Sequence, residues 1–325
     1  MSTPGPVRED MLQCANSVPL SAALGRPFES TAFQLPSFLL VGPPRTGTSW
    51  IHQALQGHAN LPSPTKETRF FDSHFHRGLK WYSSHFSTPH PDRPMGEIAP
   101  TYFASAQARE RIAQTIPAVK LIFVFRHPVQ RLISLYRTKR AYGLLRWSFE
   151  EALERDPELL ASGQYATCLQ RWQEAFPPGQ LLITLYEDLR ESPQLYLDRL
   201  LAFLGIAGRM LTTAELQQVH SSQGMTQPRY FLVTRTATAI ANWCKARSLD
   251  NLVAMVRDSQ LTKLFLDGGA PFPEISRSVL ETISEVLQPE VEALQRMMGR
   301  DLSMWNCTNG DGRVPERTIG HGSRS

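Results

Sequence analysis

A short loop at residues 42–49, GPPRTGTS, gathers the groups of this chain that are best suited to bind a charged ligand. It follows an apolar run at 38–41 and leads into residues 48–57, whose apolar spacing predicts a helix. Backbone N–H groups at a helix N-terminus lack partners within the helix and lie at the positive end of its dipole. Together with the hydroxyls of the loop and the guanidinium of Arg45, they predict a site for a phosphate group.

The loop differs from the nucleoside-triphosphate P-loop motif, GxxxxGK[ST], in where its cation lies. Thr48 stands where that motif has Lys, and the loop carries Arg45 instead. No later predicted strand ends in an Asp suited to hold Mg²⁺. We infer a donor with one transferable anionic group, neutralised by side chains without a metal. The alternatives are a P-loop kinase or NTPase, a non-catalytic nucleotide-binding module, and a strand-to-helix turn without a ligand.

A second strand-to-helix junction follows the apolar run at 120–126. A helix is expected to begin at Pro128, with an apolar face formed by Val129, Leu132, Ile133 and Tyr136. Ser134 falls on the opposite face of this helix, so Arg126, at the end of the strand, and Ser134 can together hold a second phosphate. An arginine at the sheet edge beside a solvated helix face is the alternative.

The two motifs together resemble the family of sulfotransferases that use 3′-phosphoadenosine 5′-phosphosulfate (PAPS). The first loop is similar to the family's 5′-phosphosulfate loop, and RHPVQRLIS, from Arg126 to Ser134, is similar to its 3′-phosphate motif. Segments similar to its glycan-modifying and bacterial branch are KETRFFD (66–72), GLKWY (78–82), GEIAPTYF (96–103) and DLSMW (301–305). The resemblance implies a P-loop-like α/β fold of three layers, with a central parallel sheet flanked by helices and extra C-terminal helices.

The resemblance also implies roles for individual residues. It assigns the 5′-phosphosulfate to Arg45, Thr46, Gly47, Thr48 and Ser49, and the 3′-phosphate to Arg126 and Ser134. Glu67 matches the catalytic carboxylate of the family. Tyr165 matches a tyrosine near the nucleotide, and a place at the edge of the core is the alternative for it. Ile98 stands where the glycan-modifying animal enzymes carry Lys, so Lys66 or another cation substitutes, or the acceptor binds differently.

Three other segments have open interpretations. The stretch 220–231 closes over the 3′-phosphate or is a plain loop, and its candidate contacts are Ser221, Ser222, Gly224 and Arg229. Trp81 and Tyr82 either shape an acceptor cleft or pack beneath the sheet. His74 and His76 have a spacing that a metal site can use, but no second cluster completes a coordination shell, so we predict no metal.

The chemistry of sulfuryl transfer fits these residues. In an in-line displacement, negative charge builds on the bridging oxygen as it leaves, and Arg45 and the loop amides can stabilise that charge. Glu67 can accept the proton of the acceptor. We predict transfer to a hydroxyl or an amine, of a carbohydrate or glycan-like molecule, with adenosine 3′,5′-bisphosphate as the product. A lipid or a secondary metabolite stays open as the acceptor.

Composition sets the outer limits of these interpretations. The chain has 325 residues of which 42% are apolar, enough to bury a full core, and its net charge of +4 suits an anionic nucleotide. No basic block accompanies that charge, so we predict no nucleic-acid partner. Four cysteines stand in no metal or redox spacing, which is typical of a reducing compartment. Since no long apolar run precedes residue 37, we predict neither a signal peptide nor a membrane span, and a cytoplasmic location.

Alternating periodicities predict a doubly wound sheet. Strands are expected at 37–42, 95–99, 120–126 and 180–185, and helices at 48–57, 105–115, 128–142, 148–160, 163–175 and 192–204. Beyond residue 230 the chain is expected to be helical, with two amphipathic helices on either side of Pro289. The expected organisation is an N-terminal extension at 1–36, a sulfotransferase domain at 37–307 and a disordered tail at 308–325.

Overall fold

The computed structural model describes residues 33–86, 90–220, 227–246 and 269–306, and those from Gln34 on belong to one compact unit. The described part contains a sheet of four parallel strands: β1 (Phe38–Gly42), β2 (Gly96–Ile98), β3 (Lys120–Phe125) and β4 (Leu181–Leu185). Their order across the sheet is β2-β1-β3-β4. After β1 the chain forms β2 on one side of β1 and later forms β3 on the other side. The loops after β1 and β3 therefore begin side by side at the carboxyl ends of these parallel strands.

The strands are apolar because the sheet is covered on both faces. Every residue of β1 and β2 is buried, and in β3 only Lys120 is partly exposed. Near-continuous apolar runs of this kind are typical of buried parallel strands. The four predicted strands are confirmed to within one residue at each end, and the predicted α/β class is confirmed with them.

Helices connect the strands and cover the two faces of the sheet. Their bounds are α1 (Thr48–Leu55), α2 (Gly78–Ser83), α3 (Ala106–Thr115), α4 (Pro128–Ala141), α5 (Phe149–Arg155), α6 (Pro157–Ala161), α7 (Tyr165–Ala175), α8 (Tyr186–Glu191), α9 (Pro193–Leu204), α10 (Thr213–His220), α11 (Phe231–Ala246) and α14 (Arg277–Met298). A π-helical turn, Phe70–His74, precedes α2. None of the helices in these ranges is long and apolar enough to cross a membrane.

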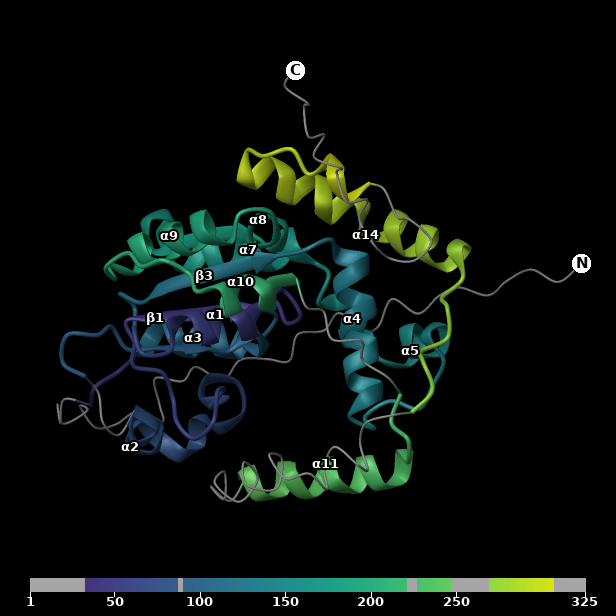
Figure 1. Ribbon diagram of the computed structural model, residues 1–325, viewed down its shortest axis with the longest axis horizontal. Helices are drawn as coiled ribbons and strands as arrows, with labels where there is room; N and C mark the ends of the chain where they lie inside the picture. Colours follow the sequence, from purple (N-terminus) through teal and green to yellow (C-terminus); the bar gives the residue numbers. More distant parts are fainter. Residues whose placement is uncertain (1–32, 87–89, 221–226, 247–268, 307–325) are drawn as a thin grey trace, which may run out of the picture. The chain divides into compact units, whose positions relative to one another are not determined.

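Alternate strand residues pack against different helices. Leu39 and Phe123 belong to the core on the face covered by α3, α7 and the C-terminal half of α14. Leu40 and Ile122 belong to the core on the opposite face, which α1, α8 and α9 cover. Figure 1 shows β1 and β3 side by side with these helices around them. The site described below lies where β1 and β3 end.

One predicted helix, 148–160, is two helices in the structure. Asp156 ends α5, and its carboxylate accepts a hydrogen bond from the Glu158 amide at 3.2 Å, which caps the start of α6. Pro157 occupies the first position of α6, where its missing N–H would have no partner in any case. The prediction of a single helix is wrong because this cap restarts the helix.

The helical prediction beyond residue 230 is confirmed by α11 and α14, but the two helices expected around Pro289 are one. Leu287 and Val291 flank Pro289 and are both buried, and Leu294 is fully buried one turn later. Burial of one continuous apolar face offsets the hydrogen bond that Pro289 cannot donate. Val286, one residue before Leu287, lies off that face and is 59% exposed.

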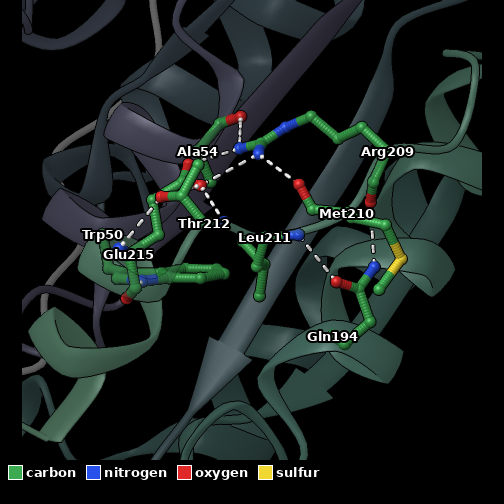
Figure 2. A network of polar contacts seen from close by, with 8 residues as sticks. All are labelled: Trp50, Ala54, Gln194, Arg209, Met210, Leu211, Thr212 and Glu215. Carbon is green, nitrogen blue, oxygen red and sulfur yellow. Dashed lines mark hydrogen bonds and ion pairs between the residues drawn. The ribbon is translucent and has the colours of Figure 1, made fainter.

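A polar network fixes α1, the helix that follows the loop at residues 43–47. Arg209 donates to the carbonyl of Ala54 at 2.8 Å and forms two hydrogen bonds with the Glu215 carboxylate, at 2.6 and 3.1 Å. The indole of Trp50 donates to the Glu215 carbonyl at 3.1 Å. Figure 2 shows that these contacts join α1, through Trp50 in its first turn and Ala54 in its last, to the segment from Arg209 to Glu215. The loop before α1 therefore leads into a helix that is held in both its first and its last turn.

Candidate active site

The loop between β1 and α1 passes through left-handed backbone conformations. The φ angle is 114° at Gly42, 73° at Arg45 and 85° at Gly47. A Cβ atom on Gly42 would lie 2.5 Å from the Pro100 carbonyl oxygen, and one on Gly47 would lie 3.0 Å from the Tyr186 ring, so both positions need glycine. Left-handed turns of this kind direct neighbouring backbone N–H groups to one side, where they form a concave anion site.

The hydroxyl groups of the loop have different environments. Thr46 is fully buried, and its hydroxyl donates to the Pro43 carbonyl at 2.8 Å, so it stabilises the loop itself. Thr48, the first residue of α1, is buried. Ser49 is exposed and accepts a hydrogen bond from Lys66 Nζ at 3.3 Å. Of the three predicted hydroxyl contacts, Ser49 is thus the one that the folded loop presents openly.

The two phosphate motifs predicted from the sequence meet in the fold. Arg45 Nε donates to Ser134 Oγ on α4 at 3.0 Å. Arg126 Nη1, at the end of β3, donates to the carbonyl oxygen of Arg45 at 3.3 Å. The structure therefore places Arg45, Arg126 and Ser134 in one cluster, on the edge of the sheet where parallel βα units bind ligands.

Positive charge is concentrated at this cluster. Burial lowers the pKa of Arg45, and the neighbouring Arg126 lowers it further. Burial likewise lowers the pKa of Lys66, which Glu67 partly offsets and Arg45 reinforces. Burial also lowers the pKa of Arg126. The Nε atom of Arg126 has no hydrogen-bond partner among the described residues. Cations that disfavour one another in this way fit a multiply charged anion, which would relieve their repulsion.

Two tyrosines contact Arg126. Its guanidinium carbon lies 4.7 Å from the centre of the Tyr186 ring, and the hydroxyl of Tyr165 donates to its carbonyl oxygen at 3.0 Å. Tyr165 is fully buried, and burial raises its pKa to about 12. Tyr165 therefore lies in the core, where it contacts the backbone of Arg126.

Glu67 lies near Ser49, which follows the loop between β1 and α1. Its carboxylate is 3.7 Å from Lys66 Nζ, and the same ammonium donates to Ser49. The side chain of Lys66 is 28% exposed and that of Glu67 is 29% exposed, so both are accessible at the surface of the site. Backbone at residue 67 is fixed by Thr65, whose hydroxyl donates to the Glu67 carbonyl at 3.1 Å. A partly exposed carboxylate beside a cationic loop is suited to accept a proton from a bound molecule.

Comparison with known proteins decides the family. Residues 35–237 match the Sulfotransferase domain family. The chain belongs to this family. The family predicted from the sequence is therefore confirmed.

Two human relatives and one solved structure describe the likeness further. Bifunctional heparan sulfate N-deacetylase/N-sulfotransferase 2 of Homo sapiens is 35% identical over 201 residues, which are 55% of this chain and 23% of that protein. Bifunctional heparan sulfate N-deacetylase/N-sulfotransferase 3 of Homo sapiens is 33% identical over 201 residues, which are likewise 55% of this chain and 23% of that protein. A sulfotransferase from Alicyclobacillus acidocaldarius has the same fold, with a TM-score of 0.60 and 20% identity over 84% of this chain and 100% of that chain. The chain spans about a quarter of the length of the curated relatives it matches.

Ile98, which stands where the glycan-modifying animal enzymes carry Lys, lies in the core of this sulfotransferase domain. Ile98 is fully buried on β2, paired with Leu40, and packs into the core instead of facing the site. Because side chains alternate along a strand, a residue one position away points to the opposite face. Lys66 is the cation that the fold brings to the loop. Tyr82, considered for an acceptor cleft, is also fully buried and lies beneath the site.

Several other predicted contacts lie elsewhere or outside the described residues. Arg229 is exposed, with its guanidinium 5.6 Å from the Tyr230 ring, and residues 221–226 lie outside the described ranges. The residue next to Arg126 in the sequence, His127, is 1% exposed and packs near Trp305, so its ring faces the core. In the parts of the chain that the structure describes, no group of three metal-ligating side chains occurs.

Sequence reasoning missed two residues of the sulfotransferase site. Tyr186 supports Arg126, and Glu187 accepts hydrogen bonds from the His127 amide at 3.0 Å and from the Trp305 indole at 3.1 Å. Both residues directly follow β4. Their place at the carboxyl end of a predicted parallel strand was the available signal, because such ends line ligand sites in α/β sheets.

Proposed function

We propose that this chain transfers the sulfuryl group of PAPS to a hydroxyl or amine of a carbohydrate. The contact between Arg126 and the Arg45 carbonyl, at 3.3 Å, carries this proposal, since it joins two anion-binding motifs at one place. A nucleotide with phosphate groups at both its 3′ and 5′ positions matches two such motifs. Membership of the sulfotransferase family supports the same assignment.

The donor would be held by residues from two loops. Arg45, Ser49 and the backbone amides from Thr46 to Thr48 are assigned to the 5′-phosphosulfate, and Arg126 with Ser134 to the 3′-phosphate. The buried Nε atom of Arg126, which has no hydrogen-bond partner in the part of the chain that the structure describes, supports this fit. Tyr165 acts through Arg126, and we keep Arg229 as a candidate contact from the segment that follows residue 226.

The donor, when bound, supplies a sulfuryl group joined to a phosphate that leaves readily. Arg45, Lys66 and the loop amides stabilise the negative charge that grows on the leaving oxygen. Glu67 accepts the proton of the acceptor, and Lys66 Nζ lies 3.7 Å from its carboxylate. Because side chains of the chain supply the positive charge, we propose that no metal ion takes part.

A glycan is the proposed acceptor. The relatives' names include a heparan sulfate N-sulfotransferase, which supports an amino sugar or a sugar hydroxyl. The partly exposed Lys66 beside Glu67 would favour an anionic sugar chain. A cytoplasmic location and a domain spanning 37–307 stay predictions.

Calorimetric titration tests the donor. We expect adenosine 3′,5′-bisphosphate to bind without a divalent ion, and ATP with Mg²⁺ to bind much more weakly. The reverse order would support the alternative, a P-loop kinase or NTPase, and contradict the proposal.

Incubation with PAPS and a panel of acceptors tests the reaction. The panel contains heparosan, its N-deacetylated form, a sterol and a phenol, and mass spectrometry records the gain of one SO₃ group. We expect a sulfated product with a carbohydrate and a large loss of rate in Arg45→Ala. Transfer only to the sterol or phenol would contradict the glycan acceptor, and binding without transfer to any of them would support a non-catalytic module.

A further inference from the structure

A carboxylate that the reaction does not use lies beneath the site. Glu97, the middle residue of β2, is fully buried. Its Oε1 accepts hydrogen bonds from the backbone amide of Thr68 at 2.5 Å and from the Thr68 hydroxyl at 2.7 Å. Its Oε2 accepts from the hydroxyls of Tyr82 at 2.8 Å and Tyr102 at 3.3 Å. Two carboxylate oxygens thus bind four donors.

All four donors are neutral, and the surroundings are aromatic. Tyr82 stacks on Phe70 with ring centres 4.4 Å apart, and Phe71 packs edge-on against Tyr102 at 5.8 Å. A buried carboxylate without a cation beside it is unfavourable unless hydrogen bonds satisfy its oxygens. Glu97 therefore strongly constrains the groups that donate to it, and the segment that contains Thr68 is the most constrained because it donates twice.

Thr68 is the residue after Glu67, so this constraint acts on the candidate base. The Thr68 hydroxyl also accepts a hydrogen bond from the Phe70 amide at 3.2 Å. Between them, Arg69 has a left-handed backbone with φ of 53°, a conformation that a non-glycine residue keeps only where neighbouring contacts impose it. Within the described residues, Arg69 and Arg45 are the non-glycine positions with positive φ, and each lies in one of the segments that build the site.

We propose that Glu97 is a positioning residue for the base: by holding the amide and hydroxyl of Thr68, it directs Glu67 and Lys66 toward the phosphate loop. This inference rests on the proposed function for the role of Glu67. It explains why a strand residue next to the buried Ile98 is a carboxylate, since only an acceptor of several hydrogen bonds can bind both donors of Thr68 and the two tyrosines. Glu97 touches neither donor nor acceptor and is not a catalytic residue.

Protonation supplies a readout that a purely structural role would not affect. Burial raises the pKa of Glu97 to about 7. The groups that face its carboxylate are Thr68, Tyr82 from α2 and Tyr102, and Glu67 is the nearby charge. The ionised form accepts all four hydrogen bonds, whereas the protonated form must donate one. The kcat of the wild type should therefore rise with pH through about 7, and a variant without this carboxyl group should lack that step.

The test compares Glu97→Gln and the milder Thr68→Val with Tyr196→Phe as a matched control. Tyr196 is buried on the opposite face of the sheet, and its hydroxyl lies 2.9 Å from Thr184 Oγ1, so its loss removes a buried hydrogen bond of the same kind. Each variant is assayed for kcat against pH and KM for PAPS, and for hydrogen–deuterium exchange of the peptide 65–71 without ligand.

We expect Glu97→Gln to lower kcat about 100-fold with an unchanged KM for PAPS, since small misplacements of a reacting group cost this much. Exchange of the peptide 65–71 should rise while that of the loop 42–49 stays unchanged. Thr68→Val should lower kcat less, and Tyr196→Phe should leave both readouts unchanged.

The inference is overturned if Glu97→Gln keeps the wild-type kcat, or if its peptide 65–71 exchanges at the wild-type rate. It is also overturned if Tyr196→Phe lowers kcat as much, because general loss of packing would then explain the effect. A wild type that transfers no sulfuryl group contradicts the proposed function, and the exchange measurement then decides the anchoring of Thr68 by itself.

Discussion

The guanidinium of Arg126 donates a hydrogen bond to the backbone carbonyl of Arg45, 81 residues earlier in the chain, at 3.3 Å. This contact joins the loops that follow two neighbouring parallel strands, and Ser134 completes the cluster by accepting from Arg45 Nε. The charge of Arg126 also lowers the pKa of Arg45, so the two guanidinium groups disfavour each other unless an anion lies between or beside them.

Arg45 is expected to contribute mainly to the rate. Arg45→Ala should lower kcat by about 10²- to 10³-fold, because it removes the positive charge nearest the loop amides. Arg45→Lys keeps the charge but loses the hydrogen bond to Ser134, and should retain more activity than Arg45→Ala. Steady-state rates with PAPS measure both. An Arg45→Ala variant with the wild-type kcat would contradict the role of this residue.

Arg126 and Ser134 are expected to contribute to affinity for the 3′-phosphate. Arg126→Met and Ser134→Ala should each raise the Kd for adenosine 3′,5′-bisphosphate, by about 10- to 100-fold for Arg126→Met, since a hydrogen bond to a charged group is involved. Adenosine 5′-monophosphate, which lacks the 3′-phosphate, is the control ligand, and its Kd should change little. Equal losses for both nucleotides would show that Arg126 serves the fold instead of the 3′-phosphate.

Glu67 is expected to act on the chemical step alone. Glu67→Gln should lower kcat by about 10²- to 10⁴-fold and leave the Kd for adenosine 3′,5′-bisphosphate unchanged, because the amide cannot accept the proton of the acceptor. Glu110→Gln, an exposed carboxylate on α3, is the matched control and should keep the wild-type kcat. A Glu67→Gln variant that turns over at the Glu110→Gln rate would exclude Glu67 as the base.

Glu215 is expected to stabilise the fold in a pH-dependent way. Its pKa is lowered to about 2 by hydrogen bonds from Arg209, so its contribution is full above its ordinary value of 4.5 and is lost as the pH falls toward 2. Glu215→Gln should lower the free energy of unfolding by about 1–2 kcal/mol at neutral pH, and the difference should vanish in acid. Urea denaturation at several pH values measures it.

The control for that experiment is Glu281→Gln. Arg277 and Glu281 form an exposed ion pair on α14, with side chains 78% and 52% exposed. Pairs of this kind contribute about 0.5 kcal/mol or less. A Glu281→Gln variant that loses as much stability as Glu215→Gln would contradict the importance given to the partly buried network in Figure 2.

Glu97 is expected to affect stability with the opposite sign. Its pKa is raised from 4.5 to about 7 by burial, so the folded chain binds a proton more tightly than the unfolded chain. The favourable contribution is full below pH 4.5 and is lost as the pH rises to about 7. Relative to Glu97→Gln, the free energy of unfolding of the wild type should fall over this range, by roughly 3 kcal/mol. A constant difference between the two proteins would contradict a raised pKa.

Local sequence signals were enough to predict the two strand-to-helix junctions that the structure brings together. Glycines that need positive φ, a helix start directly after a buried strand, and a proline at the next helix start are all short-range features. They identified Gly47, Arg45 and Arg126 because each residue's position relative to its own strand decides where it lies. The same features predicted the four strands, whose apolar runs need burial on both faces.

The helix boundaries show where local signals fail. Asp156 and Pro157 restart a helix within the expected one, and Pro289 fails to end α14 because tertiary packing on both sides of it outweighs the lost hydrogen bond. In both cases the apolar periodicity of the sequence does not carry the energy of a cap or of a packed face.

Chain pattern alone thus determined the family, the strands and the two loops that bring positive charge to one edge, because these depend on residue types and spacing within a single βα unit. Only the folded structure decided that Lys66 and not residue 98 faces the loop, that Tyr165 lies under Arg126, and that Glu97 holds Thr68. Each of these contacts joins distant segments, and one residue's shift along a strand turns a side chain from the site to the core.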